Sequence, residues 1–395
     1  MNELINSGNT SFLMLATLLV FIMIPGLALF YGGLVERKNS LTMMFYTFIS
    51  IGVVTIMWYF GGFSLVFGKD IGGIIGNPME YFMLNNVDFS INKSYDATTP
   101  FLLFFIYQLM FAIITPPLMT GAFANRVSPF GWVKMQILWM LLIYFPVAHW
   151  VWGEGMLSHM GFVDYAGGTV IHATAGFSSL VAIILLGKRA EMPKKNYGNI
   201  NLMLIGTSLL MFGWFGFNSG GAMAADEVAS IAFVNTGLAA AFAMTVWTII
   251  SYYFRRKLSF VEIATGAVAG LATITPASGY VTPQGATIIG VLAAMGCFMF
   301  LELLKIFKID DALGVWGVHG MGGFMGTLYI GLFADDRVNQ VSAGWEQFLT
   351  QAIGVVGVSA YSMLMMWIIM KIIRGNVSSK VQHEGLDTEY FDPKG

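Results

Sequence analysis

Apolar runs of about 20 residues, long enough to cross a hydrocarbon core of roughly 30 Å, recur along the whole chain. No other feature constrains the fold as much. Only 11% of the 395 residues are charged, whereas soluble domains carry about 25%. The sequence therefore predicts an all-α integral membrane protein with no sizeable soluble domain. The net charge of −2 and the lack of a basic run give no reason to expect a nucleic-acid partner.

The runs define eleven candidate transmembrane spans. They cover residues 10–35, 41–67, 99–122, 131–152, 166–187, 200–222, 228–253, 260–279, 284–306, 312–333 and 345–373. Glycine and proline occur inside several spans, which membrane helices tolerate.

Basic residues are distributed unevenly between the two sides that these spans define. The loops after odd-numbered spans and the C-terminal tail, together with the span ends next to them, carry all but three of the 20 Lys and Arg; the exceptions are Lys69, Lys93 and Arg337. Cytoplasmic loops are enriched in basic residues. We therefore expect a multi-pass protein of the cell (cytoplasmic) membrane, with an extracellular N-terminus and a cytoplasmic C-terminus. A miscounted span would scramble this asymmetry, so it also supports the number eleven.

Similar motifs suggest an internal repeat of five spans. FAIITPP (111–117) in the third span resembles LATITPA (271–277) in the eighth, and ALFYGG (28–33) loosely resembles FGFNSGG (215–221). Repeating an odd number of spans inverts the second copy, an arrangement common among transporters. Spans 1–5 and 6–10 are thus predicted to be related by an inverted pseudo-two-fold axis.

Two histidines occupy matching places in these halves. DYAGGTVIH (164–172) begins span 5 and DALGVWGVH (311–319) begins span 10, each with an aspartate eight positions before its histidine. Eight helical residues rise about 12 Å, which is near the middle of a core roughly 30 Å thick. Because the two spans run in opposite directions, His172 and His319 should approach the midplane from opposite faces.

Such histidines have a functional and a structural interpretation. Ionisable residues at this depth are rare and usually mark a pathway, although a helix-packing histidine bonded to a neighbour is the simpler alternative. The repeated spacing favours function. A metal site is disfavoured because the chain has no HExxH, no Cys cluster and no suitably spaced third ligand. No cofactor is expected.

Three further residues have two interpretations each. Asp164 and Asp311 precede helical runs, so both are expected first of all to cap those helices. The glycines after Asp164 also let a small substrate come close. Trp152, in HWVWGEG (149–155), is either a membrane-interface residue or a site whose ring attracts a small cation, by about 0.5–2 kcal/mol.

At these motifs the chain resembles the ammonium transporter family (Amt/Mep/Rh), prokaryotic Amt type. The motifs follow one another in the family order: IPGLALFYGGL (24–34), AHWVWGEG (148–155), DYAGGTVIH (164–172), GWFGFNSGG (213–221), DDALGVWGVHGMGG (310–323) and EGLD (384–387). The resemblance implies an eleven-helix membrane domain over residues 1–374 and a cytoplasmic tail over 375–395. It also implies a homotrimer with one narrow pore per subunit, surrounded by membrane lipids.

The resemblance also assigns roles to individual residues. It implies that ammonium is recruited at Trp152, Phe111, Tyr107 and Asp164, and that Phe111 and Phe217 stack as a gate. His172 and His319 would share a hydrogen bond along the pore. The remaining pore positions implied by the family are Leu27, Trp214, Asn218, Thr275 and Val315.

The chain departs from the family pattern at two positions. Gly221 stands where the family often has a serine at the recruitment site, and the nearby Ser219 is not equivalent. Gly314 replaces a common aspartate in the span 10 motif. In the tail, HEGLD (383–387) resembles a segment that packs across subunits. A trimeric PII-type regulatory protein is a possible partner at the same face.

The expected function is transport of ammonium or ammonia, with methylammonium as an analogue. A bare cation is costly to bury, so NH4+ should lose its proton at the gate, NH3 should cross, and the proton should follow separately, making transport electrogenic. Potassium has no proton to give up. The alternatives are a neutral gas or solute channel, an ammonium sensor acting through a bound regulator, and an intramembrane hydrolase. The hydrolase ranks last because no nucleophile accompanies the histidines; we expect no enzyme activity.

Overall fold

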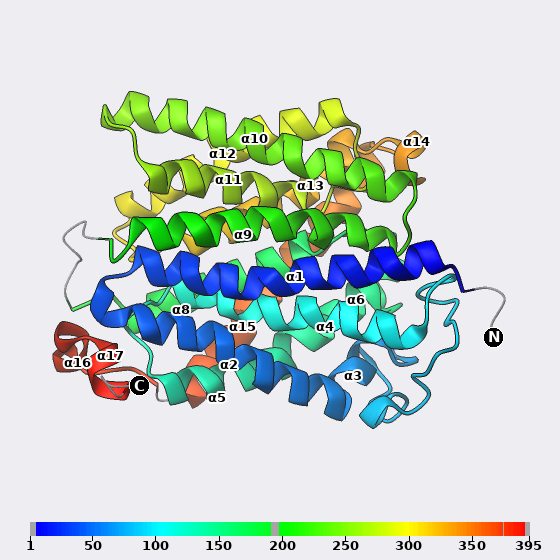
Figure 1. Ribbon diagram of the computed structural model, residues 1–395, viewed down its shortest axis with the longest axis horizontal. Coiled ribbons are helices and arrows are strands. Elements are labelled where there is room, and N and C mark those ends of the chain that lie inside the picture. Colours follow the sequence, from blue (N-terminus) through cyan, green and yellow to red (C-terminus); the bar gives the residue numbers. More distant parts are fainter. Residues whose placement is uncertain (1–4, 191–196, 374, 392–395) are drawn as a thin grey trace.

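The computed structural model describes residues 5–190, 197–373 and 375–391, which form an elongated bundle of helices lying side by side (Figure 1). Within these ranges, nine helical segments are long and apolar enough to cross a membrane by length and composition. Eleven helical segments match the eleven predicted spans. The expected all-α membrane architecture is therefore confirmed.

The first five segments run from α1 to α8. They comprise α1 (Ser7–Leu34); α2 (Ser40–Met57), η2 (Trp58–Gly62) and α3 (Phe63–Phe67); α4 (Phe101–Leu118) and η4 (Met119–Gly121); α5 (Pro129–Trp139), η5 (Met140–Tyr144), α6 (Phe145–Trp152) and α7 (Met156–His159); and η6 (Gly168–Ala173) with α8 (Thr174–Leu186). Short elements η1 (Arg37–Asn39), β1 (Asp70–Ile71), β2 (Ile75–Gly76) and η3 (Phe82–Leu84) lie in the connections, and β1 pairs with β2 in an antiparallel hairpin.

The remaining segments form the second half and the end of the chain. They comprise α9 (Ile200–Ser219) with η7 (Gly220–Ala222), α10 (Glu227–Arg255), α11 (Phe260–Ile274), α12 (Pro283–Ile306), η8 (Trp316–Gly320) with α13 (Met321–Phe333), α14 (Asp336–Asn339), α15 (Trp345–Ile372), α16 (Ser379–Glu384) and α17 (Leu386–Tyr390). Among the predicted boundaries that differ, the span expected over 260–279 is helical only to Ile274. Pro276 follows closely, and proline commonly lies one or two residues beyond a helix end.

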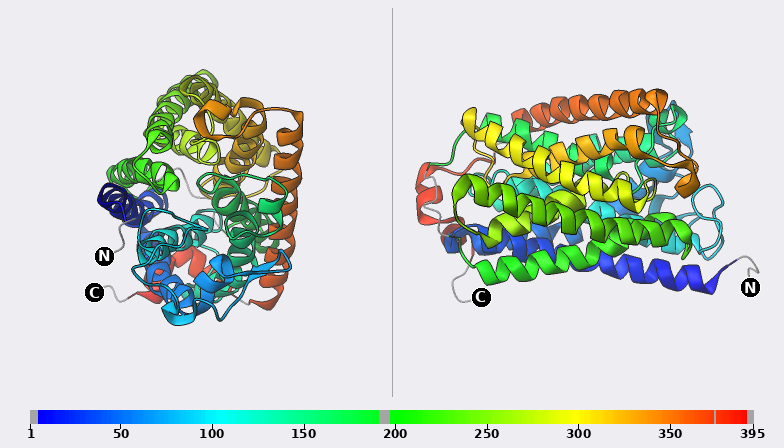
Figure 2. Two further views of the ribbon diagram at one scale, coloured as in Figure 1. Left: turned by 90° about the vertical axis from the view of Figure 1, so that its right-hand side faces the viewer. Right: turned by 90° about the horizontal axis from the view of Figure 1, so that it is seen from above.

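The two halves meet along α1 and α9, which lie next to each other over most of their length (Figure 1). Small residues allow this contact. A Cβ on Gly33 would lie 2.5 Å from the Met203 nitrogen, and a Cβ on Gly206 would lie 2.3 Å from the Phe30 nitrogen. Glycine at such positions lets membrane helices approach closely. On the outside of the bundle, α15 packs against both α8 and α13 and so joins the halves (Figure 2).

The bundle has two ends, which we name after the termini. At the N-terminal end, Asn9 bonds Thr98 through its side-chain nitrogen and accepts the Ala225 N–H. The C-terminal end, where α16 and α17 lie (Figure 1), includes three loops that are joined to one another. These loops follow η4, α8 and α12.

A buried ion cluster joins the three loops at the C-terminal end. The Asp310 carboxylate lies 2.6 Å from the Arg189 guanidinium and 3.8 Å from that of Arg126. Arg126 also donates to the backbone carbonyls of Gly187, Ala122 and Asp310. All three charged side chains are less than a tenth exposed. Buried charges are stable only when paired in this way.

The tail docks on its own chain at this end. The Asp387 carboxylate accepts the Leu41 and Thr42 N–H groups at 2.9 and 2.8 Å, so it caps the start of α2. The Leu386 N–H donates to the Asn39 side chain at 2.9 Å, and the Leu386 side chain is fully buried. The packing across subunits implied by the HEGLD resemblance remains a prediction.

Candidate functional site

Asp164 organises the backbone that carries the first histidine. One carboxylate oxygen accepts the N–H groups of Gly167 and Gly168 at 2.9 and 2.7 Å. The other accepts those of Thr169 and Val170 at 2.8 and 3.0 Å. Four orphan donors at the start of η6 are thereby satisfied. The capping prediction for Asp164 is confirmed. Asp164 is buried, with 4% of the residue exposed.

Asp311 repeats this arrangement on the opposite side with fewer bonds. Its oxygens accept the N–H groups of Val315 and Trp316 at 3.0 and 2.8 Å, at the start of η8. The capping prediction is confirmed here too. Both histidine-bearing segments begin as π-helices, η6 and η8, before continuing as α-helices. Single π turns occur frequently at functional sites.

The two histidines meet in the centre of the bundle. The Nδ1 atoms of His172 and His319 lie 3.2 Å apart, and the rings stack with centroids separated by 5.2 Å. Both residues are buried. An Nδ1–Nδ1 hydrogen bond requires one ring to donate and the other to accept, so two neutral rings adopt opposite tautomers. The Nε2 atom of His172 has no hydrogen-bond partner among the described residues.

A narrow cavity adjoins the histidine pair. It encloses about 10 Å³, which is near the minimum that admits one water-sized molecule. We call it the inner cavity. Its walls are almost wholly apolar, formed by Met23, Leu27, Phe30, Ile114, Leu118, Ile171, Leu210, Trp214, Phe217 and Val268 around the two histidines.

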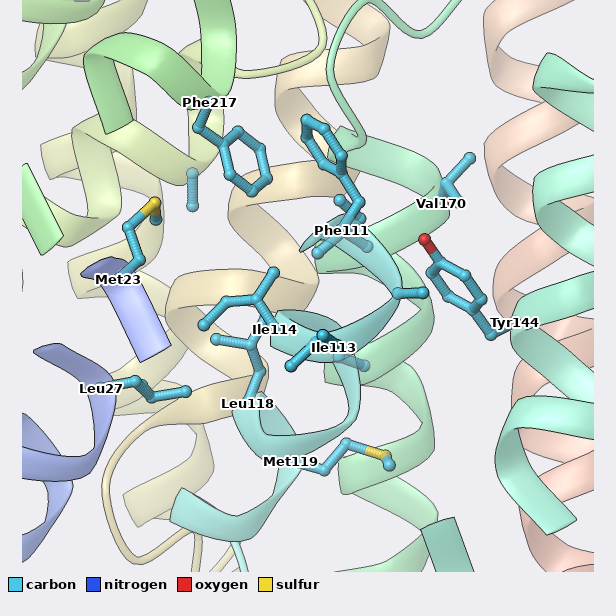
Figure 3. Close-up of a cluster of buried hydrophobic side chains, with 14 of the residues drawn as sticks. Met23, Leu27, Phe111, Ile113, Ile114, Leu118, Met119, Tyr144, Val170 and Phe217 are labelled. Carbon is cyan, nitrogen blue, oxygen red and sulfur yellow. The ribbon is translucent and has the colours of Figure 1, made fainter. Parts of the chain in front are cut away.

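Phe111 and Phe217 close this cavity on the side of the N-terminal end. Their ring centroids lie 4.6 Å apart at an interplanar angle of 58°. Figure 3 shows the two rings pointing toward each other, with Ile114, Leu118 and Leu27 beyond them. Phe217 also contacts the His172 ring, at a centroid distance of 6.2 Å. The rings therefore separate the inner cavity from the space on the N-terminal side.

That space is a larger cavity at the N-terminal end, of about 470 Å³. We call it the vestibule. Tyr107, Phe111, Trp152 and Asp164 all line it. The Phe111 ring lies edge-on to those of Tyr107 and Trp152, with centroids 4.9 and 6.2 Å away, and the Trp152 Nε1–H donates to the Asp164 carbonyl at 2.9 Å.

A row of aromatic rings thus runs from the vestibule to the inner cavity. Neighbouring rings are in contact from Trp152 through Phe111, Phe217 and His172 to His319. The residues expected at the recruitment site and the gate come together, as do the two histidines. Leu27 and Trp214, two of the expected pore residues, line the inner cavity.

Three of the expected pore residues line neither cavity. Asn218 is buried and donates to Thr236 at 2.8 Å. Thr275 accepts the Trp214 Nε1–H at 2.8 Å, so it orients a ring that does face the cavity. The Val315 N–H is bonded to Asp311.

Sequence reasoning missed several vestibule residues. Gln108 and Tyr165 line it next to predicted residues, and Asp226 adds a carboxylate from the cap of α10. A polar residue beside Tyr107 inside an apolar span was the available signal for Gln108. Gly221 also lines the vestibule, where a Cβ would lie 3.0 Å from the Tyr165 ring. The described residues contain no group of three or more His, Cys, Asp and Glu side chains able to hold a metal ion.

Comparison with known proteins assigns the chain to a family. Residues 11–394 match the model of the Ammonium Transporter Family. The chain belongs to that family. The resemblance seen in the sequence is therefore confirmed over nearly the whole chain, and the protein is an integral membrane protein.

Members of the Ammonium Transporter Family share both sequence and structure with this chain. Ammonium transporter Amt1 of Archaeoglobus fulgidus is 39% identical over 97% of each chain. The crystal structure of Candida albicans Mep2 is 32% identical with a TM-score of 0.90, covering all of this chain and 93% of that one. A structure titled Sensor Amt Protein is 28% identical with a TM-score of 0.89, covering 97% and 98% of the two chains.

Proposed function

We propose that this chain transports ammonium across the cell membrane by recruiting NH4+, removing its proton and conducting NH3. The observation that carries this proposal is the His172–His319 pair, buried behind the Phe111–Phe217 contact and beside a cavity of about 10 Å³. So narrow and apolar a passage suits a small neutral molecule that can hydrogen-bond, and it opposes a hydrated ion.

Recruitment would take place in the vestibule. The faces of Trp152, Phe111 and Tyr107 attract a cation through their negative π clouds, and this interaction is weak enough to be reversible. Asp226 adds negative charge to the wall. The Asp164 oxygens already accept four N–H groups. We therefore assign Asp164 the task of holding η6 and, through its carbonyl, the Trp152 ring.

Ammonium would lose its proton before it passes the phenylalanine pair. Burying an unpaired charge in so apolar a space costs many kcal/mol, whereas neutral ammonia crosses with little penalty. Potassium cannot shed its charge and would be rejected at the same point. Beyond the rings, the Nε2 atoms of the pair supply one donor and one acceptor, because the two rings adopt opposite tautomers, and the His172 Nε2 has no partner among the described residues.

The released proton would cross separately, which makes transport electrogenic. The histidine pair is its proposed carrier, since an imidazole can accept a proton at one ring nitrogen and release one from the other. We place the N-terminal end outside the cell and the C-terminal end in the cytoplasm, in keeping with the distribution of Lys and Arg. A homotrimer with one pore per subunit and a PII-type partner at the C-terminal end complete the proposal.

Currents from purified protein in proteoliposomes on a solid-supported membrane test this function. Ammonium jumps should give a current and potassium jumps none, while the double variant His172→Ala/His319→Ala should lose this selectivity. An internal pH dye separates the remaining outcomes. Alkalinisation without current would mean neutral ammonia conduction, and no response of either kind would overturn transport and favour an ammonium sensor.

A further inference from the structure

A third buried histidine, His149, lies one helical turn before Trp152 on α6. Its side chain is fully buried. Nδ1 lies 2.7 Å from the Val66 carbonyl oxygen, and Nε2 lies 2.9 Å from the Asp70 carboxylate. Val66 belongs to α3 and Asp70 begins the β1–β2 hairpin. One imidazole therefore joins α3, the hairpin and α6 at the N-terminal end.

Both ring nitrogens of His149 face groups that can only accept. A backbone carbonyl and a carboxylate have no proton to donate, and a neutral imidazole has a single N–H. The two hydrogen bonds therefore require one additional proton. Asp70 does not hold it: both of its oxygens accept the Gly73 N–H at 2.9 Å, and the hydrogen bond from His149 lowers the pKa of the Asp70 carboxyl. Only a doubly protonated ring, an imidazolium beside the carboxylate, donates in both contacts.

Other charged groups lie on the segments packed around this pair. Asp70 is flanked by Lys69 in the hairpin, and His159 on α7 lies near enough for its charge to act on Asp70. Glu154 follows α6, and Asp164 precedes η6. Among the described residues, Asp70 is the charged group that is hydrogen-bonded to the His149 ring.

The pair anchors the turn that carries Trp152. The hairpin is held to this region by the Trp150 Nε1–H, which donates to the Ile74 carbonyl at 2.9 Å, and by the Met156 N–H, which donates to Gly73 at 2.9 Å. The His149 carbonyl accepts the Gly153 N–H at 2.9 Å, which closes the last turn of α6. The position of the Trp152 ring thus depends on where His149 is held.

We propose that the His149–Asp70 ion pair is a proton-dependent clamp that positions Trp152 in the vestibule, so that ammonium is bound less tightly as the pH at that face rises. Loss of the ring proton leaves a nitrogen lone pair facing an acceptor oxygen, and the clamp opens. His149 and Asp70 act as positioning residues, and this role rests on the proposed recruitment of ammonium at the vestibule.

Two substitutions of Asp70 separate the proton from the contact. In Asp70→Asn, the new amide can donate to a neutral His149 Nε2 while its oxygen still accepts from Gly73, so the clamp stays closed without the extra proton. Asp70→Ala removes the partner altogether. The half-saturating ammonium concentration is measured from currents at vestibule-side pH values between about 6 and 8.5.

The expected result is a difference in pH dependence. The half-saturating concentration of the native protein, divided by that of Asp70→Asn, should rise at least three-fold across this range. The half-saturating concentration of Asp70→Ala should be high at every pH. Comparing variants at each pH cancels the titration of ammonium itself. Equal pH dependence in the native protein and Asp70→Asn would overturn the clamp. If the native protein gave no current with ammonium, both the proposed function and the clamp would be overturned.

A spectroscopic measurement tests the proton independently of transport. In protein labelled with ¹⁵N-histidine, the His149 signals are identified by their loss in His149→Gln. Both ring nitrogens should be protonated at neutral pH in the native protein, and only one in Asp70→Asn. A single protonated nitrogen on native His149 would show that the ion pair does not form, whatever the currents show.

Discussion

Phe111 and Phe217 face each other with ring centroids 4.6 Å apart, and they are the only aromatic pair among the described residues that contributes one ring to the vestibule and the other to the inner cavity. The contact joins α4 of the first half to α9 of the second. The separation of the vestibule from the inner cavity therefore depends on how the two halves are packed.

Truncating one of these rings should let water into the inner cavity. Hydrophobic constrictions exclude ions and water by dewetting, so Phe217→Ala is expected to raise the osmotic water permeability of proteoliposomes several-fold and to admit a potassium current. Phe215→Ala is the matched control, because the Phe215 ring packs against Phe233 instead, at 4.5 Å. Native water permeability in Phe217→Ala would place the barrier elsewhere.

The unequal numbers of bonds made by the two capping aspartates predict unequal costs of substitution. In Asp164→Asn, the amide nitrogen would face two N–H donors, whereas in Asp311→Asn it would face one. Each buried unsatisfied donor costs about 1–3 kcal/mol. Thermal unfolding in detergent should therefore give the order native, Asp311→Asn, Asp164→Asn from most to least stable. Equal melting temperatures for the two variants would contradict this ranking.

Removing the carboxylate of the buried ion cluster should destabilise the C-terminal end. Asp310→Ala leaves Arg126 and Arg189 buried without their counter-charge, and breaking a buried pair costs about 3–5 kcal/mol. Asp335→Ala serves as the control, since its partner Arg337 has an 83% exposed side chain. Chemical unfolding of both variants in detergent measures the difference, and similar losses would refute it.

The cost of Asp310→Ala should also depend on pH. Burial alone would raise the pKa of Asp310, but the hydrogen bonds and charge of Arg189, with the charge of Arg126, hold it below its usual value. A carboxyl with a lowered pKa stabilises the fold above its unfolded pKa of about 3.9 and loses that effect as pH falls through the folded value. The native protein and the variant should therefore converge in stability only below about pH 4.

The tail contact makes a local prediction. Asp387→Ala removes the cap of α2 formed with Leu41 and Thr42, and losing a helix cap costs about 1 kcal/mol. We expect α16 and α17 to detach while the bundle stays folded, so trypsin should cut faster after the exposed Lys380 at an unchanged overall melting temperature. Glu389→Ala, which alters an exposed residue of α17, should leave the cleavage rate at its native value.

The sequence was most informative where the signal was local or repeated. Apolar runs predicted all eleven helical segments, and the aspartates that precede two of them predicted the caps. The eight-residue spacing placed His172 and His319 near the midplane, whereas their hydrogen bond was implied only by the family resemblance. The uneven distribution of Lys and Arg between loops predicts an orientation directly from the sequence, since it depends only on the order of the spans.

Features that depend on distant contacts were not predictable. The His149–Asp70 pair joins residues 79 positions apart, and the Asp387 cap joins residues 345 apart, so neither leaves a periodic trace in the chain. The end of α11 at Ile274 was missed because the apolar run continues past it. Asn218 and Thr275 are bonded to Thr236 and Trp214, and neither they nor Val315 line the two cavities, so their place in the pore remains a prediction.

The π turns η6 and η8 have a consequence at the level of the gene. A π turn holds one residue more than an α turn, so an in-frame deletion of the Ala173 codon would let the segment become regular helix without shifting α8 or the loop before it. With α8 fixed, His172 would take the place of Ala173, about 100° around the helix axis, and its imidazole would turn away from His319. Such an allele is expected to produce a protein that inserts and folds normally yet is silent, which separates what the histidines do from what assembly requires.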